Sequence, residues 1–429
     1  MKQLRPYPQA VITKKGARFL EAGNVWVYDA EVLETRPAPL DGREAQNGDL
    51  VDVVDEKGGY LGTGLLSQQS KIRVRIVSRN ANDRFDEAFW ERKIRWAWEY
   101  RQTVMGRASL PGCAPDTDCC RVVFSEADGF PGLVVDRYGD VLVTESLTVG
   151  MERLRPVLFP LLARIVGENG TPVRGIFERN DARIREKEGL PLYKGWYDLE
   201  GLPTPESARL VVSENGVRYN IDVENSQKTG FFLDQKYNRR AVARLAQGRR
   251  VLDCFTHVGT FALNCAVAGA EFVHGVDISA TAVDCCRHNA ELNGVADRTR
   301  FTCANVFDLL TGLDGDRDAM REAGGPFDLI VLDPPAFTKN RKTVHEATRG
   351  YRQINYRAMR MLPRGGYLAT CSCSHFMDDQ LFRDVIREAA HDAGVQLRQV
   401  EARQQAPDHP IVWGIPETSY LKFLIFQVV

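Results

Sequence analysis

The stretch Arg249-Arg-Val-Leu-Asp-Cys-Phe-Thr-His-Val-Gly259 decides the fold of the second half of this chain. A short apolar run ends on the carboxylate of Asp253, and the chain turns through one glycine, Gly259, into a helical pattern that begins at Thr260. A strand, a tight turn and a helix in this order open the ligand sites of α/β sheets. From residue 249 onward strands and helices alternate, which predicts an α/β fold with a mostly parallel sheet covered on both faces.

The number of glycines in this turn distinguishes between cofactors. A pyrophosphate requires several glycines in the pattern G-x-G-x-x-G, because the backbone must approach the phosphates closely. This turn has one glycine, and no phosphate-binding sequence G-x-x-x-x-G-K-[ST] occurs in the chain. A dinucleotide or ATP site is therefore not expected. S-adenosylmethionine, which carries an adenosine without phosphates, fits the turn better.

The composition is that of a globular protein with more than one domain. A chain of 429 residues is longer than a single domain with one hydrophobic core usually is. Its content of 44% hydrophobic and 26% charged residues is ordinary for a globular protein. No apolar run approaches the roughly 18 residues of a membrane span, and the first residues do not resemble a signal peptide. We therefore expect a cytoplasmic protein whose ten cysteines are reduced. Cys113, Cys119 and Cys120 lack the paired C-x-x-C spacing of a zinc site, so no metal is expected.

Three regions of different character follow one another. Residues 1–80 show short apolar runs, glycine turns and almost no helical pattern, which predicts a small β-rich domain. Residues 84–195 predict a small α+β domain, and residues 205–429 hold the alternating α/β pattern. Because the formal net charge is −1, RNA binding must come from local basic patches. In the predicted strand 71–77, Lys71, Arg73 and Arg75 share one side and either face solvent or contact RNA.

Polar side chains stand at the ends of the predicted strands. Ligands bind outside the carboxyl ends of strands in an open α/β sheet, so these side chains are expected to surround one site. Asp277 is placed to accept the ribose hydroxyls, or else to cap a helix. Asn305 either contacts the adenine or is a turn residue, and Asp253 is expected to orient the turn and the sulfonium end of the cofactor. The set consists of Asp253, Asp277, Asn305, Asp333 and Cys373.

Two of these residues indicate the chemistry. In Asp333-Pro-Pro-Ala-Phe337 the prolines stiffen the strand end and aim the carboxylate into the cleft, while Phe337 is suited to stack on a base. Methylation of carbon 5 of a pyrimidine requires a nucleophile that adds to carbon 6, and a thiolate of Cys373 is the candidate. Asp333 is the candidate acid near ring nitrogen 3. Cys371 lies two residues earlier on the same strand face, so spacing alone does not choose between the cysteines.

Several long motifs in a fixed order resemble one family, the bacterial large-subunit ribosomal RNA methyltransferase I family. These cytosine-5 methyltransferases carry an N-terminal PUA domain, and the resemblance runs over nearly the whole chain. The motifs are Ser125-Glu-Ala-Asp-Gly-Phe-Pro-Gly132, Arg185-Glu-Lys-Glu-Gly189, Lys228-Thr-Gly-Phe-Phe-Leu-Asp-Gln235, Asp253-Cys-Phe-Thr-His-Val-Gly259, Asp333-Pro-Pro335, Arg349-Gly-Tyr351, Ser372-Cys-Ser374 and Asp408-His-Pro410.

The resemblance implies a PUA domain, a small central α+β domain and a Rossmann-like methyltransferase domain that binds S-adenosylmethionine. It implies 23S rRNA as the partner and Cys373, between two serines, as the nucleophile. Asp333 is the second catalytic residue expected, on the strand-end argument above. A homodimer is one option for the assembly, which the sequence does not decide. By the same resemblance, the segment 228–235 and the turn after Asp253 line the cofactor site. Together with the residues at the strand ends, the expected cofactor-binding residues are Lys228, Thr229, Phe231, Asp253, Phe255, Thr256, Gly259, Asp277, Ile278, Asn305 and Asp333.

Two other functions compete with cytosine-5 methylation. The first is methylation of guanine in RNA with a structural cysteine, because Asp-Pro-Pro sequences also serve nitrogen methylation. The second is a non-catalytic RNA-binding assembly factor that uses the N-terminal domain. The set of acids at the strand ends, together with Cys373, argues against the second.

Overall fold

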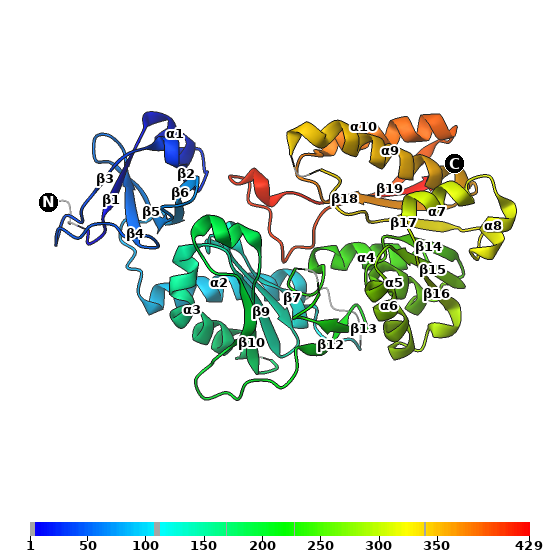
Figure 1. Ribbon diagram of the computed structural model, residues 1–429, viewed down its shortest axis with the longest axis horizontal. Helices are drawn as coiled ribbons and strands as arrows, with labels where there is room; N and C mark the ends of the chain where they lie inside the picture. The colour runs from blue at the N-terminus through cyan, green and yellow to red at the C-terminus, as the bar shows by residue number, and fades with distance from the viewer. Residues whose placement is uncertain (1–4, 107–111, 169, 227, 339) are drawn as a thin grey trace.

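In this computed structural model the described residues form four β-sheets, one of them a two-stranded hairpin, and the sheets with their helices make up three parts that follow one another along the chain (Figure 1). The structure describes residues 5–106, 112–168, 170–226, 228–338 and 340–429. We call the three parts the N-terminal module (β1 to β6), the central module (α2 to β11) and the C-terminal module (β12 to β20). We propose that they correspond to the domains expected at residues 1–80, 84–195 and 205–429.

The N-terminal module is a six-stranded sheet in the order β2-β6-β5-β4-β1-β3. It also contains a helix, α1, where the sequence predicted almost none. Thr13 caps α1 through the Gly16 amide, and only a narrow stripe, Gly16, Ala17 and Leu20, is buried. The helix has only eight residues and includes a glycine, which disfavours helix formation, so the sequence pattern did not mark it. The elements are β1 Gln9–Ile12, α1 Lys14–Glu21, β2 Trp26–Tyr28, β3 Val32–Arg36, β4 Leu50–Val54, β5 Tyr60–Leu66 and β6 Ile72–Ser78.

The predicted basic side of the strand at 71–77 does not form an open cationic face. Arg73 forms an ion pair with Asp29. Arg75 is buried and binds Glu188 of the central module, with 3.1 Å between Nη2 and Oε1. Arg75 therefore joins two modules, a role that alternation along a single strand does not reveal.

The central module packs two long helices against a five-stranded sheet in the order β11-β10-β9-β8-β7. Trp90, Ile94 and Trp98 recur at helical spacing along α2 and are buried in the core of this module. The predicted α+β character is confirmed by these elements, and β11 is an additional strand. The bounds are α2 Glu87–Met105, β7 Cys119–Phe124, β8 Leu133–Tyr138, β9 Val141–Ser146, α3 Val149–Gly167, β10 Gly175–Asn180 and β11 Tyr193–Tyr197.

The C-terminal module begins with a hairpin and continues as a seven-stranded sheet in the order β16-β15-β14-β17-β18-β20-β19. Strands β16, β15, β14, β17 and β18 are mutually parallel, whereas β20 runs antiparallel to both of its neighbours. The bounds are β12 Arg209–Glu214, β13 Val217–Asp222, α4 Lys236–Ala243, β14 Arg250–Cys254, α5 Thr260–Val267, β15 Phe272–Asp277, α6 Ala280–Leu292, β16 Thr299–Cys303, α7 Val306–Leu313, α8 Arg317–Glu322, β17 Leu329–Leu332, α9 Val344–Met361, β18 Tyr367–Ser372, α10 Asp379–Ala393, β19 Leu397–Arg403 and β20 Lys422–Val428.

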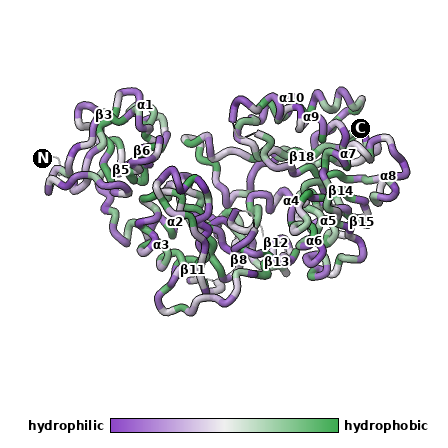
Figure 2. The backbone as a smooth tube through the Cα atoms, viewed as in Figure 1, coloured by the Kyte–Doolittle hydropathy of each residue, from purple (hydrophilic) through white to green (hydrophobic). Residues whose placement is uncertain are grey.

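Two hydrophobic cores cover the two faces of this sheet. Helices α4, α5 and α6 contribute to one core, and α7, α9 and α10 contribute to the other. In Figure 2 hydrophobic residues gather along the inner strands, and hydrophilic residues line outer helices such as α10. The doubly covered α/β sheet expected from the sequence is thus confirmed. Among the described residues, no helix combines the length and apolar character needed to cross a membrane.

Buried polar contacts join the modules. The ammonium of Lys236, fully buried on α4, donates to the carbonyls of Asp116, at 2.5 Å, and of Cys119 in the central module. The loop between β19 and β20, coloured red in Figure 1, extends from the C-terminal sheet toward the other two modules. Gly414 in this loop packs against Gly23 of the N-terminal module.

Candidate active site

The sheet brings the predicted site residues to one edge. In the parallel register Cys254 lies opposite Leu332 of β17, and Asp277 lies opposite Cys303 of β16. The carboxyl ends of neighbouring strands are therefore level, and the turns that follow them share one side of the module. This arrangement brings the predicted set at the strand ends together, as the α/β topology requires.

The turn after β14 has a backbone shape that most residues avoid. Phe255, His257 and Gly259 have φ values of 63°, 53° and 86°. Asp253, fully buried below the turn, accepts hydrogen bonds from the Thr256 hydroxyl and from the Ala262 amide, the latter at 2.9 Å. Left-handed non-glycine residues persist only where the surroundings fix them, and they cluster at ligand sites. Asp253 thus holds the turn in shape.

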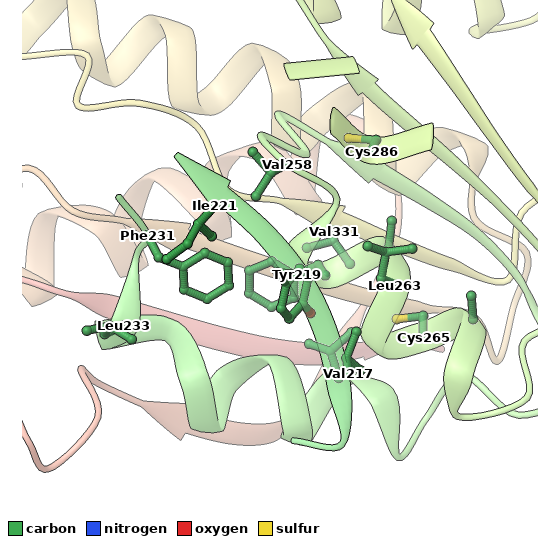
Figure 3. Close-up of a cluster of buried hydrophobic side chains, with 14 of the residues drawn as sticks. Val217, Tyr219, Ile221, Phe231, Leu233, Val258, Leu263, Cys265, Cys286 and Val331 are labelled. Carbon is green, nitrogen blue, oxygen red and sulfur yellow. The ribbon is translucent and has the colours of Figure 1, made fainter. Parts of the chain in front are cut away.

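Hydrophobic side chains of the core pack against the same turn. Figure 3 shows Val258 of the turn and Leu263 of α5 among the side chains of one core cluster, together with Tyr219 of β13. A Cβ atom on Gly259 would lie 3.1 Å from the Leu263 side chain, at a φ that disfavours any other residue. Gly259, the one glycine of this turn, is therefore required by packing and by its backbone conformation.

Asp277 and Ile278 fit an adenosine. Asp277, half-buried at the end of β15, accepts the His257 amide at 2.9 Å and the Ser279 amide at 3.0 Å. A carboxylate has about four acceptor directions, so capacity remains for ribose hydroxyls. The next side chain, Ile278, is 73% exposed, which is unusual for isoleucine and suits an apolar contact with a purine. The N-cap of helix α6 is Ser279, whose hydroxyl accepts the Ala282 amide, and not Asp277.

Asn305 serves as a helix cap. Its side-chain oxygen accepts the Phe307 amide at 2.9 Å at the start of α7. Contact with the adenine remains a prediction. Beside it, Phe255, Phe307 and Phe337 form an aromatic cluster with ring centroids 5.7 to 6.5 Å apart. Phe337 packs against Tyr351 of α9 as well, with the centroids 4.6 Å apart.

The segment from Lys228 to Gln235 crosses the junction between modules. Thr229 is buried and donates to the Asp136 carboxylate of β8 at 2.5 Å, and Phe231 is buried in the core against Tyr219. The side chains of Thr229 and Phe231 are both buried, so they would affect cofactor binding only by fixing the position of the backbone between Lys228 and Gln235. Lys228 is exposed, has a φ of 50°, and holds its ammonium 4.7 Å from the centroid of the Phe232 ring.

The catalytic candidates lie where β17 and β18 end. Cys371 is fully buried, and its Sγ lies 2.8 Å from Oδ1 of Asp333. Gln235 donates to the same Asp333 oxygen at 3.1 Å and to the Cys371 sulfur at 3.4 Å. Cys373 follows the strand and is partly exposed. The two cysteines, which the sequence did not separate, therefore differ in environment: Cys371 is fully buried against Asp333, whereas Cys373 is only partly buried.

Burial dominates the electrostatics of this site. It raises the pKa of Asp333 to about 6 and that of Asp253 to about 7, because the charged forms lose solvation. Burial and then the Asp333 charge raise the pKa of Cys373 to about 11, while the positive charge of Lys228 acts in the opposite direction. Cys373 in the free protein is therefore a thiol, and its activation requires added positive charge or a proton acceptor.

Several contributors were not singled out from the sequence. Asp234 is buried and accepts the Tyr420 hydroxyl at 2.7 Å, and Lys422 donates to the Ser374 carbonyl at 2.7 Å. Burial lowers the Lys422 pKa to about 8, and the charge of Cys373 opposes that shift. Tyr420 precedes β20 and Lys422 begins it, far along the chain from Asp234 and Ser374, so no local pattern signalled these contacts. Within the described ranges, no group of three His, Cys, Asp or Glu side chains is arranged to hold a metal ion.

Comparison with known proteins identifies the family. A model of S-adenosylmethionine-dependent methyltransferases matches residues 196–427, and a PUA-like domain model matches residues 10–79. Ribosomal RNA large subunit methyltransferase I from Shewanella amazonensis is 38% identical over 96% of this chain and 97% of the relative. The chain belongs to the ribosomal RNA large subunit methyltransferase I family. The family member from Klebsiella pneumoniae is 35% identical over 97% of each chain.

Solved structures show the same fold. A methyltransferase complexed with SAH is 18% identical, has a TM-score of 0.76, and aligns over 98% of this chain and 100% of its own. The expected fold class, with a PUA-like N-terminal domain and a Rossmann-like methyltransferase domain, is confirmed. The cofactor of this family member is S-adenosylmethionine, as the single-glycine turn predicted.

Proposed function

We propose that this protein methylates carbon 5 of a cytosine in 23S rRNA, with Cys373 as the covalent nucleophile. The observation that carries the proposal is the partly exposed Cys373 thiol at the end of β18, next to the strand end that holds Asp333. Relatives with 35 to 38% identity are named as methyltransferases of large-subunit ribosomal RNA, which supports rRNA as the substrate. An enzyme with this substrate works in the cytoplasm.

The cofactor is assigned to the turn after β14 and the end of β15. Asp277 would hold the ribose hydroxyls, Ile278 would contact the purine, and the turn from Phe255 to Gly259 would face the methionine end. S-adenosylmethionine, when bound, supplies an electrophilic methyl group and a positive sulfonium charge. Asp253 contributes by fixing the turn through Thr256 and the Ala262 amide.

Cys373 makes carbon 5 reactive. Its sulfur forms a bond to carbon 6 of the ring, and the electron pair of the 5,6 double bond moves toward carbon 5, which becomes nucleophilic. The thiol must first release its proton, because its pKa of about 11 leaves little thiolate at neutral pH. The ammonium groups of Lys228 and Lys422 act on this thiol and favour the thiolate. After methylation a base accepts the carbon 5 proton, the carbon–sulfur bond breaks with its electron pair on the Cys373 sulfur, and nitrogen 3 returns its proton to Asp333.

Asp333 is assigned as the acid at ring nitrogen 3. A general acid works best with a pKa near the working pH, and burial raises that of Asp333 to about 6. Gln235 and Cys371 fix one of its oxygens by hydrogen bonds, which orients the carboxyl group. A proton from Asp333 on nitrogen 3 would balance the negative charge that sulfur addition places on the ring.

Nucleoside analysis tests this proposal. Ribosomal RNA from cells that lack the protein is incubated with purified enzyme and S-adenosylmethionine, digested, and examined by mass spectrometry. The proposal predicts 5-methylcytidine with the wild type and none with Cys373→Ala, while both proteins bind the cofactor equally. Methylated guanosine would support the competing guanine reaction. Full activity of the Cys373→Ala protein would overturn the covalent mechanism.

A further inference from the structure

Two motifs that the proposed chemistry does not use meet on helix α2. They are Ser125–Gly132, which follows β7, and Asp408–Pro410, in the loop between β19 and β20. The fully buried Arg101 guanidinium binds both oxygens of Asp128, at 2.5 and 2.8 Å, and donates to the Asp408 carbonyl at 2.8 Å. A bidentate charged contact fixes geometry strongly. The two loops are therefore held in one arrangement on α2.

A cavity of about 260 Å³ lies beside this junction. Trp96, Ala97 and Tyr100 of α2 line it, together with Asp128 and Pro410 from the two motifs. Residues four apart share one face of a helix, so Trp96 and Tyr100 stand next to each other along the cavity. The cavity is thus bounded by parts of the central and C-terminal modules.

The aromatic side chains of this cavity are exposed. Trp96 is 60% exposed and Tyr100 is 38% exposed, whereas Trp90 and Trp98 of the same helix are buried in the core. Folding of the module therefore does not account for the aromatic face. In the same loop as Pro410, Trp413 is 97% exposed. Large aromatic groups presented in this way are typical of binding surfaces.

The cavity is connected to the active site through the loop between β19 and β20. His409, next to Pro410, packs on Phe124 with 5.3 Å between ring centroids. The ring centroids of Phe124 and Tyr420 are 6.3 Å apart, and the Tyr420 hydroxyl donates to Asp234 in the active site. The guanidinium of Arg92 lies 5.5 Å from the centroid of the Trp96 ring, at the edge of the cavity, and forms a solvent-exposed ion pair with Asp83 at 3.4 Å.

We propose that this cavity is a subsite for an unpaired nucleotide of the substrate RNA, whose base stacks on Trp96 and Tyr100. The inference rests on the proposed function for the identity of the substrate. Unpaired RNA bases commonly stack on exposed aromatic side chains, and a nearby arginine suits the adjoining phosphate. A nucleotide bound here lies beside the loop that leads to Asp234, so it belongs to the strand that presents the target base.

Binding of a fluorescein-labelled twelve-nucleotide oligocytidylate to the full-length protein tests the subsite. The double variant Trp96→Ala/Tyr100→Ala should weaken the Kd about tenfold or more, since stacking on an aromatic group contributes ~1–3 kcal/mol per base. With rRNA as substrate, KM should rise by a similar factor while kcat and cofactor binding stay unchanged. The variant Trp96→Phe/Tyr100→Phe, which keeps the rings, should restore most of the affinity.

Leu192→Ala is the matched control, because Leu192 is 41% exposed and does not line the cavity. Unchanged Kd and KM in the alanine double variant would overturn the subsite. Loss of cofactor binding or of thermal stability in that variant would also overturn it, in favour of a structural role. The oligonucleotide arm requires no methylation. A subsite confirmed there stands even if Cys373→Ala keeps its activity and the covalent mechanism fails.

Discussion

At the scale of single residues, environment separates groups that look alike in the sequence. Cys371 and Cys373 are two residues apart, yet the first contacts Asp333 at 2.8 Å in full burial and the second is partly exposed. Asp253 and Asp277 both end strands, but Asp253 is buried under the turn while Asp277 is half-buried. We infer that Cys371 and Asp253 position other groups, and that Cys373 and Asp277 contact ligands.

Replacing Cys371 by alanine should change the pH dependence of the reaction rather than abolish it. The Cys371 hydrogen bond lowers the pKa of Asp333, so its removal should raise that pKa further above about 6. An acid with a higher pKa keeps its proton to higher pH, so the decline of kcat/KM with rising pH should begin later. Cys265→Ala, at another buried cysteine, is the control and should leave the profile unchanged. An identical profile in Cys371→Ala would contradict the assignment of Asp333 as the acid.

Asp253 should make stability depend on pH. Its pKa of about 7 exceeds the ordinary value of 3.8, so the folded protein holds this proton more tightly than the unfolded chain. This contribution is complete below pH 4 and is lost as the pH rises through 7. The free energy of unfolding of the wild type relative to Asp253→Asn should therefore fall between pH 4 and 8, by up to about 4 kcal/mol. Urea titrations of both proteins measure the difference, and a constant difference would refute the argument.

At the scale of elements, the turns and packing of the sheet restrict which residues fit. Gly275 of β15 is an example, because a Cβ atom there would lie 2.7 Å from the Phe301 ring and 3.1 Å from the Thr256 hydroxyl. Gly195 of β11 has open space at the same position. The turn after β14 and the neighbouring strands thus approach each other closely at one glycine.

Gly275→Ala should destabilise the protein by about 1–3 kcal/mol through overpacking and should weaken cofactor binding by displacing Thr256. Gly195→Ala is the matched control in another strand and should be nearly neutral. Urea denaturation and calorimetry with S-adenosylhomocysteine measure the two effects. Equal stability and equal cofactor affinity of the Gly275→Ala and Gly195→Ala proteins would contradict the overpacking argument.

The elements also show what sequence patterns reveal and what they miss. The strand ends at Asp253, Asp277 and Asp333 were predicted because apolar runs bounded by acids are strong local signals. Strand β19, Leu397–Arg403, was missed because most of its side chains are exposed or half-buried, so no apolar run marks it. The contacts of Gln235 with Asp333 and of Tyr420 with Asp234 join distant segments, which no local pattern encodes.

At the scale of the whole molecule, buried charges fix how the modules meet. The Arg75–Glu188 pair joins the N-terminal and central modules, with side-chain exposures of only 10% and 3%. Lys236 and Arg101 make comparable links between the central and C-terminal modules. The three modules are therefore expected to act as one assembly and not as tethered domains.

Glu188→Gln should destabilise the junction by about 3–5 kcal/mol, because it leaves the buried Arg75 charge without its partner. The double variant Arg75→Met/Glu188→Met removes both charges and should recover most of that loss. Thermal unfolding, combined with proteolysis of the connection at residues 79–86, reports on the junction. Additive effects of the two substitutions would show that the pair is not coupled.

The most direct test of the account is covalent capture of the enzyme on RNA that contains 5-fluorocytidine. Fluorine on carbon 5 cannot leave as a proton, so the methylated adduct should persist on the protein. The account predicts an adduct that requires S-adenosylmethionine, is assigned to Cys373 and not to Cys371 by fragmentation of the peptide in the mass spectrometer, and is absent in Cys373→Ala. An adduct on Cys371, or methylation of a base other than cytosine without any adduct, would contradict it.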